Sequence, residues 1–149
     1  KAQDIDPLAQ IVGIVDFYDK LVSRRGGRQA MIPHDAVRQL FLVGERGQYP
    51  KALVESVIRS IGVYPVGSLV RLNTGEQAVV VGVNPEQRLK PQVKITGGPH
   101  GESYVNPERV DLSLPSQGRG TRTVLRVLDP IQERVNIAMY LGDLTDQAA

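Results

Sequence analysis

The sequence of 149 residues contains no cysteine, and that absence removes several kinds of chemistry at once. Without a cysteine sulfur, disulfide bonds, catalytic thiols and thiolate metal sites are all excluded. No apolar run approaches the roughly 18 residues that suggest a membrane-spanning helix, and no signal-peptide pattern opens the chain. Because the lack of cysteine agrees with a reducing compartment, we expect a cytoplasmic protein. Because no long apolar run is present, we expect no insertion into a membrane.

A surplus of charge of one sign is also missing. The 18 basic and 16 acidic residues leave a formal charge of +2. Proteins that bind nucleic acid usually gather lysine and arginine in one stripe, which this chain lacks, so we expect neither DNA nor RNA as a partner. Hydrophobic residues make up 41% of the chain, enough to build the core of one ordinary domain or of two small ones.

Three helical patterns occupy residues 1–62. The first runs from about residue 6 to about residue 22, with Asp6 suited to cap it and Pro7 to its first position. Apolar side chains cover more than half of its helical wheel, so we expect a central, largely buried helix. The second opens near residue 32. The third has the clearest helical repeat, and we expect a shared core made of its apolar stripe and two valines of the first helix: Leu53, Val54, Val57, Ile58, Ile61, Val12 and Val15.

From residue 63 onward the pattern changes to short strands separated by turns. Strands are predicted near residues 68–72, 77–83, 92–95, 109–112 and 123–128, and a short helix around residues 136–141. The predicted fold class is α+β. An N-terminal helical segment over residues 1–62 is followed, over residues 63–149, by a small antiparallel β module with a short C-terminal helix.

Two aspartates inside the first helix are the strongest candidates for a functional role. Asp16 and Asp19 lie three residues apart and therefore share a helix face, with Asp19 near the centre of the apolar stripe. A buried carboxylate needs a compensating partner, because an unpaired buried charge is strongly destabilising. A metal such as iron or manganese could compensate it. The alternatives are an ion pair with Arg25 or Arg28, or a capping contact with a neighbouring helix.

The spacing around these aspartates resembles the segment D-x-Y-D-A-L-T-S-D-R-P-Y-R, which closes the catalytic domain of HD-GYP cyclic di-GMP phosphodiesterases. The residues that match without a gap are Asp16, Tyr18, Asp19, Leu21, Ser23, Arg25 and Arg28. The residues that depart from it are Lys20, Val22, Arg24, Gly26 and Gly27. The likeness extends over roughly residues 5–95, through segments 61–68, 71–76, 80–81, 84–85 and 89–91.

The resemblance implies the C-terminal portion of a metal-dependent cyclic di-GMP phosphodiesterase, a bacterial signalling enzyme. It makes Asp16 a metal ligand, Asp19 the supporting neighbour of that site, and Arg25 and Arg28 the cations that face the substrate phosphates. It also implies iron or manganese in the intact parent, with cyclic di-GMP as its substrate. The missing N-terminal part of the same protein is an expected partner, and homodimer formation stays open.

The chain itself lacks most of that metal site, because it contains only two histidines, His34 and His100, where the family uses several. Asp35 completes an H-D dipeptide, but the x-G-K that follows in the catalytic motif is absent, and Asp35 suits the first turn of a helix instead. We therefore expect no bound cofactor and no hydrolysis from this chain alone. Since the chain begins at Lys1, we also expect a piece of a longer protein.

Two other functions stay open. One is a non-catalytic regulatory or protein-interaction module built on a degenerate HD fold, and the residues encoded upstream of Lys1 would distinguish it from the enzyme. The other is a standalone SH3-like binding module, which predicts that residues 63–128 fold without residues 1–60. The basic run at residues 118–122 matches no phosphate-loop pattern, so it gives little support to a further phosphate site.

Overall fold

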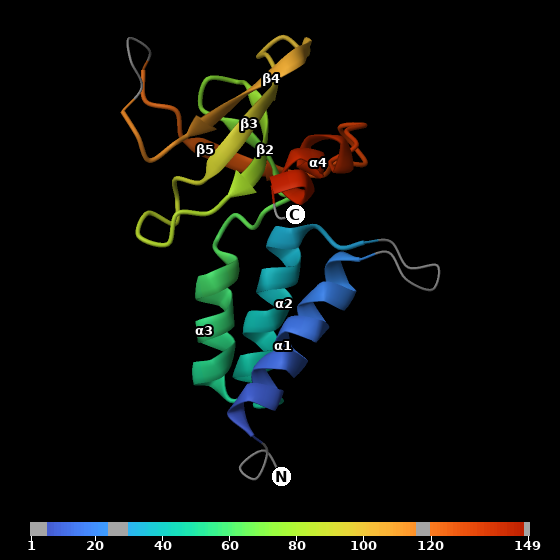
Figure 1. The fold of residues 1–149 in the computed structure, drawn as a ribbon, viewed down its shortest axis with the longest axis vertical. Helices are drawn as coiled ribbons and strands as arrows, with labels where there is room; N and C mark the ends of the chain where they lie inside the picture. Colours follow the sequence, from blue (N-terminus) through green and yellow to red (C-terminus); the bar gives the residue numbers. More distant parts are fainter. Residues whose placement is uncertain (1–5, 24–29, 116–119, 148–149) are drawn as a thin grey trace. The chain divides into compact units, whose positions relative to one another are not determined.

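The computed structural model describes residues 6–23, 30–115 and 120–147. The chain divides into two compact units, Lys1–Val63 and Tyr64–Ala149, the first helical and the second built on a sheet (Figure 1). The α+β class is confirmed, because three helices precede a five-stranded antiparallel sheet and a short helix in the described part of the chain. Among the described residues, none of the helices combines the length and the apolar character that a membrane crossing requires.

The helical unit consists of α1 (Pro7–Val22), α2 (Pro33–Glu45) and α3 (Lys51–Ile61). Asp6 caps α1 as predicted, since its Oδ1 accepts a hydrogen bond from the backbone N–H of Leu8 at 3.0 Å. At the other end of the unit, Gly62 terminates α3 with a φ of 93°. Glycine adopts this left-handed backbone without strain, which explains why α3 ends there.

The core of the helical unit forms where one face of each helix meets the other two. Its fully packed side chains are Ile14, Leu40, Val54 and Val57, and Leu53, Ile58 and Ile61 pack against them while partly buried. The predicted apolar stripe on α3 is thus confirmed. Burial also affects a phenol beside this core: it raises the pKa of Tyr18 to about 12, because the charged phenolate loses hydration.

The prediction of a largely buried α1 is wrong. Val12 and Val15 are 61% and 48% exposed, and the buried residues of α1 are Gln10 and Ile14. The inner face of α1 instead runs through Ile11, Ile14, Phe17 and Tyr18. Apolar side chains surround so much of this helix that its pattern fits several directions, and packing against α2 and α3 selects one of them.

Replacing a core side chain of α3 should destabilise the helical unit. Val57→Ala is expected to lower the free energy of unfolding by about 1–4 kcal/mol, because it leaves a cavity at a side chain only 6% exposed. Urea unfolding would measure this loss. The exposed Ser56 on the same helix offers a control, since Ser56→Ala should change stability by no more than about 0.5 kcal/mol. Equal losses for the two variants would contradict the burial of this stripe.

The second unit is an antiparallel sheet with the strand order β4-β3-β2-β1-β5. Its strands are β1 (Leu69–Leu72), β2 (Gln77–Gly82), β3 (Gln92–Gly97), β4 (Ser103–Asp111) and β5 (Val124–Leu128), and α4 (Ala138–Gln147) follows them. All five predicted strands are present. β4 begins earlier than predicted, because its first half is exposed and lacks the apolar alternation of a half-buried strand. It also contains Pro107, which an edge strand tolerates.

Both faces of this sheet bury apolar side chains. One face carries Val70, Leu72, Ala78, Val80, Val93 and Ile95, joined by Leu112. The opposite face carries Leu69, Val79 and Leu128, against which Val135, Ile137, Tyr140 and Leu141 pack. Because successive strand residues point to opposite sides, burial of both faces explains the continuous apolar run in β2, and β1 is apolar on both sides except at Arg71. The segment around α4 therefore covers one face of the sheet (Figure 1).

Candidate functional site

Asp16 and Asp19 lie on the exposed side of α1. The Nζ of Lys20 is 2.9 Å from the Oδ2 of Asp16, and both side chains of this pair are more than half exposed. Exposed pairs of this spacing contribute only about 0.3–0.5 kcal/mol, so Lys20 does not fix Asp16 firmly. Asp19 Oδ1 accepts a hydrogen bond from the hydroxyl of Ser23 at 3.5 Å. The two carboxylates are therefore presented outward by a regular helix.

The prediction of a buried Asp19 is wrong, because this residue is exposed. The inner face of α1 is turned away from it and runs through Ile14. Arg25 and Arg28, the predicted partners of Asp19 and candidate contacts of substrate phosphates, lie outside the described residues. The roles of Asp16 as a metal ligand and of Asp19 as its support therefore stay predictions.

No complete metal site is assembled within the described part of the chain, where no three His, Cys, Asp or Glu side chains are grouped to hold an ion. The Nδ1 of His34 lies 3.1 Å from the backbone oxygen of Val63, so this ring belongs to the packing of the helical unit. His100 is exposed, and its backbone N–H donates to Glu102 Oε2 at 2.8 Å. The carboxylate of Asp16 is chemically suited to iron or manganese, but only as one ligand of a larger set.

A polar cluster that the sequence did not reveal surrounds Asp111 at the end of β4. Its Oδ1 accepts hydrogen bonds from the backbone N–H of Ser113 at 2.9 Å, the hydroxyl of Ser113 at 2.6 Å and the Nδ2 of Asn84 at 2.9 Å. Asn84 Nδ2 also donates to the backbone oxygen of Lys90 at 2.5 Å. The spacing D-x-S was the available signal, since an aspartate often accepts hydrogen bonds from the residue two positions on. The cluster joins the end of β4 to the turn after β2.

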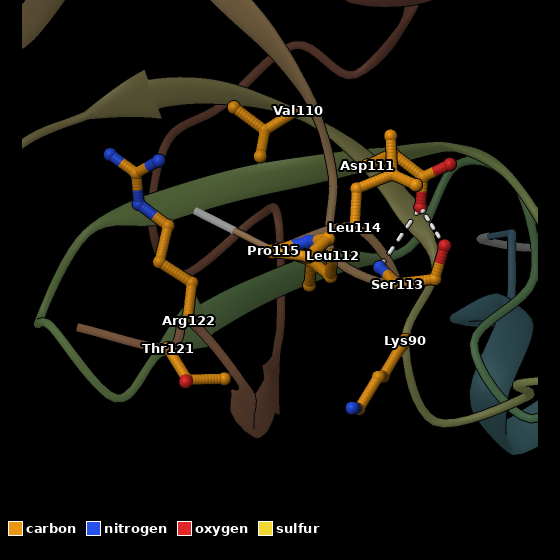
Figure 2. A pocket seen from close by; sticks show the side chains of 9 residues that line it. All are labelled: Lys90, Val110, Asp111, Leu112, Ser113, Leu114, Pro115, Thr121 and Arg122. Carbon is orange, nitrogen blue, oxygen red and sulfur yellow. Dashed lines mark hydrogen bonds between the residues drawn. The ribbon is translucent and has the colours of Figure 1, made fainter. Parts of the chain in front are cut away.

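Asp111 borders a shallow hollow of about 210 Å³, whose lining includes Lys90, Leu114 and Arg122 (Figure 2). The hydroxyl of Ser113 is the main reason why the pKa of Asp111 lies below its usual range. Partial burial of the carboxylate acts in the opposite direction, while the Ser113 N–H and Asn84 add to the lowering. Asp111 is therefore an ionised acceptor whose hydrogen bonds serve the fold.

Replacing the carboxylate of Asp111 should make the stability of the fold depend less on pH in the acid range. The folded-state pKa of Asp111 lies below the unfolded value of about 3.9, so Asp111 stabilises the fold above that pH. This contribution is lost as the pH falls through the lower folded-state pKa. The difference in thermal midpoint between the wild type and Asp111→Asn should thus be greatest near neutral pH and shrink in acid. Glu108→Gln on the same exposed strand is the control, and a difference that does not vary with pH would refute the role of the charge.

A second cluster joins the turn after β1 to the segment that enters β5. Arg122 donates from Nε and Nη2 to the two carboxylate oxygens of Glu76 at 2.9 and 3.3 Å. These side chains are only 10% and 13% exposed. Asn73 adds two hydrogen bonds to the same segment, one to the backbone oxygen of Thr121 at 2.8 Å and one from the N–H of Thr123 at 3.0 Å. Arg122, in the basic run at residues 118–122, thus joins the segment before β5 to the turn after β1.

Comparison with known proteins identifies relatives of both units. Residues 69–119 match a family model described as a KOW domain associated with HD domain. A cyclic di-GMP phosphodiesterase of Pseudomonas aeruginosa is 27% identical over 115 residues, which make up 77% of this chain and 27% of that relative. The chain thus spans only about a quarter of the relative's length. No solved structure matches the chain. The matches show similarity to HD-associated proteins and to a phosphodiesterase of that signalling nucleotide.

Proposed function

We propose that this chain is the C-terminal part of a metal-dependent cyclic di-GMP phosphodiesterase of the HD-GYP type, a cytoplasmic bacterial signalling enzyme. The observation that carries the proposal is the 27% identity to a cyclic di-GMP phosphodiesterase of Pseudomonas aeruginosa over 77% of the chain. The match of residues 69–119 to a KOW domain associated with HD domain supports an HD-containing parent. The D-x-Y-D segment of α1 supports the finer assignment to the HD-GYP type.

In this proposal Asp16 supplies one ligand of a metal site that residues outside this chain complete. The position of Asp16 on the exposed side of α1 supports its role as a ligand, because its carboxylate can face another part of the protein. A side chain on the inner face, such as Ile14, is covered by the core of the helical unit. Iron or manganese, when bound, would activate the water that hydrolyses the phosphodiester. Asp19 lies on the same side of α1 and helps to hold the site in position.

The substrate is recognised by its phosphates. Arg25 and Arg28 are the cations proposed to face them, since a guanidinium can donate two parallel hydrogen bonds to a phosphate. In the reaction, the oxygen of one water forms a bond to phosphorus and a bond from phosphorus to a ribose oxygen breaks. The departing ribose oxygen takes up a proton, so one water is consumed for each bond that is cleaved. The arginines offset the negative charge that the phosphate carries through this step.

The test compares the 149-residue chain with the longer polypeptide, meaning the proposed phosphodiesterase of which this chain is the C-terminal part. After incubation with iron or manganese and dialysis, the chain alone should retain no stoichiometric metal and cleave no cyclic di-GMP, since its described residues group no complete ligand set and the chain has only two histidines. The longer polypeptide should retain the metal and cleave cyclic di-GMP. A chain that binds one equivalent of metal and cleaves the dinucleotide by itself would overturn the fragment assignment. An inactive longer polypeptide that lacks the two upstream motifs of the HD-GYP family, H-D-x-G-K and H-H-E-x-x-x-G-x-G-Y-P, would favour the non-catalytic module instead.

A further inference from the structure

The outward side of α1 carries three apolar side chains in a line. Leu8, Val12 and Val15 are 67%, 61% and 48% exposed. Spacings of four and three residues stack them along one side of the helix. This outer stripe lies away from the inner face, where Ile14 is fully buried against the other helices. An exposed helix face is usually polar, so the outer stripe indicates a surface that another structural element covers.

The same side of α1 becomes anionic toward its C-terminal end. Asp19 follows Val15 by four residues and Asp16 follows Val12 by four, so both aspartates continue the direction of the outer stripe. Two of their contacts, the pair of Asp16 with Lys20 and the hydrogen bond from Ser23 to Asp19, lie at the helix surface. Whatever covers this side of α1 must therefore be apolar at one end and able to donate hydrogen bonds or carry positive charge at the other.

A second copy of this chain does not meet that requirement. A two-fold interface brings the same surface of both copies together. If the two α1 helices run antiparallel about Val12 and Val15, Leu8 of each copy faces Asp19 of the other, and a carboxylate loses its water against a leucine. If they run parallel, each aspartate faces its own counterpart, and like charges repel. Both arrangements cost free energy, which leaves an element of different sequence as the better occupant.

We infer that the outer stripe of α1 is the docking surface for a helix of the same polypeptide, from the part that precedes Lys1. This inference rests on the proposed function, in which the chain belongs to a longer protein. The length of the relative supports it, because the aligned region makes up only 27% of that protein. The docking helix places apolar side chains on Leu8, Val12 and Val15. It directs a hydrogen-bond donor or a cation toward Asp16 and Asp19.

The variant Val12→Gln tests this surface without altering the charge around the aspartates, and glutamine is a good helix former. In the longer polypeptide it should lower the midpoint of thermal unfolding by roughly 5 °C or more, because an amide is buried among apolar groups. In the 149-residue chain the midpoint should not change, because Val12 is 61% exposed there. Val105→Gln on β4 is the matched control. Val105 is 93% exposed, so the midpoint of neither protein should move.

An unchanged midpoint for Val12→Gln in the longer polypeptide would overturn the docking surface. So would a dimer of the 149-residue chain, measured by sedimentation, that Val12→Gln dissociates. If Val12→Gln prevents the longer polypeptide from folding, Leu8→Ala should still give a smaller fall in its midpoint. Hydrolysis of cyclic di-GMP by the unchanged longer polypeptide separates the two proposals. If the longer polypeptide is active and Val12→Gln leaves its unfolding midpoint unchanged, only the docking surface is refuted. If Val12→Gln lowers the midpoint but the unchanged longer polypeptide is inactive, only the proposed enzyme is refuted.

Discussion

Asp16→Ala in the longer polypeptide is expected to lower the turnover of cyclic di-GMP by about 100-fold or more and to release metal. Changes to groups that only support a metal ligand already cost about 10–100-fold, so the loss of a ligand should cost at least as much. The effect should be confined to chemistry and metal binding, since Asp16 is exposed on α1 and its pair with Lys20 is a surface contact. A turnover assay and elemental analysis of the purified variant would measure both losses.

The control for this variant is Asp35→Ala, which removes an exposed carboxylate from α2 in the same helical unit. Its turnover and metal content should remain those of the wild type. In the 149-residue chain, Asp16→Ala should change the free energy of unfolding by no more than about 0.5 kcal/mol, which would show that the helix still folds. Normal turnover and metal content in the longer Asp16→Ala variant would show that Asp16 is not a ligand. The non-catalytic module would then be the better account.

Glu76→Ala is expected to lower the free energy of unfolding of the β unit by about 3–5 kcal/mol, because it leaves the charge of Arg122 buried without its partner. The geometry supports a large effect, since the two groups form a bidentate pair and are only 10% and 13% exposed. The variant also removes the acceptor for the hydroxyl of Thr74, 2.7 Å from Glu76 Oε1. Urea unfolding followed by circular dichroism would measure the loss, since the chain has no tryptophan to report by fluorescence.

Two further variants make this test specific. Glu86→Ala removes an exposed carboxylate from the turn after β2 and should change stability by no more than about 0.5 kcal/mol. The double variant Glu76→Ala/Arg122→Ala should lose less than the sum of the two single variants, because the residues act as one unit. A loss below about 1 kcal/mol for Glu76→Ala would mean that the pair behaves as a surface salt bridge.

The elements that could be predicted are those whose signals are local. Leu53, Val54 and Val57 repeat at the helical spacing, and Gly62 stops α3 where a left-handed residue is needed. The turn at residues 73–76 separates two apolar runs, and these became β1 and β2 in direct antiparallel register. In each case a few neighbouring residues contain the whole pattern, so no knowledge of the tertiary packing was required.

The features that could not be predicted depend on contacts between distant residues. The side of α1 that is buried is selected by α2 and α3, so the position of Asp19 within a broad apolar pattern did not reveal its exposure. Arg122 and Glu76 lie 46 residues apart, and Asn84 and Asp111 lie 27 apart. Their pairing follows from the strand order rather than from any motif, because β5 lies beside β1, and β3 has β2 on one side and β4 on the other. Arg25 and Arg28, the proposed contacts of the substrate phosphates, lie outside the described residues, so their roles rest on resemblance.

The most direct measurement is the hydrolysis of cyclic di-GMP by the purified longer polypeptide loaded with iron or manganese. We expect cleavage of a phosphodiester bond, which a chelator stops and which the 149-residue chain does not catalyse, because this chain has only two histidines where the HD-GYP family uses several. A longer polypeptide that holds metal through Asp16 yet leaves cyclic di-GMP intact would contradict the proposed enzyme.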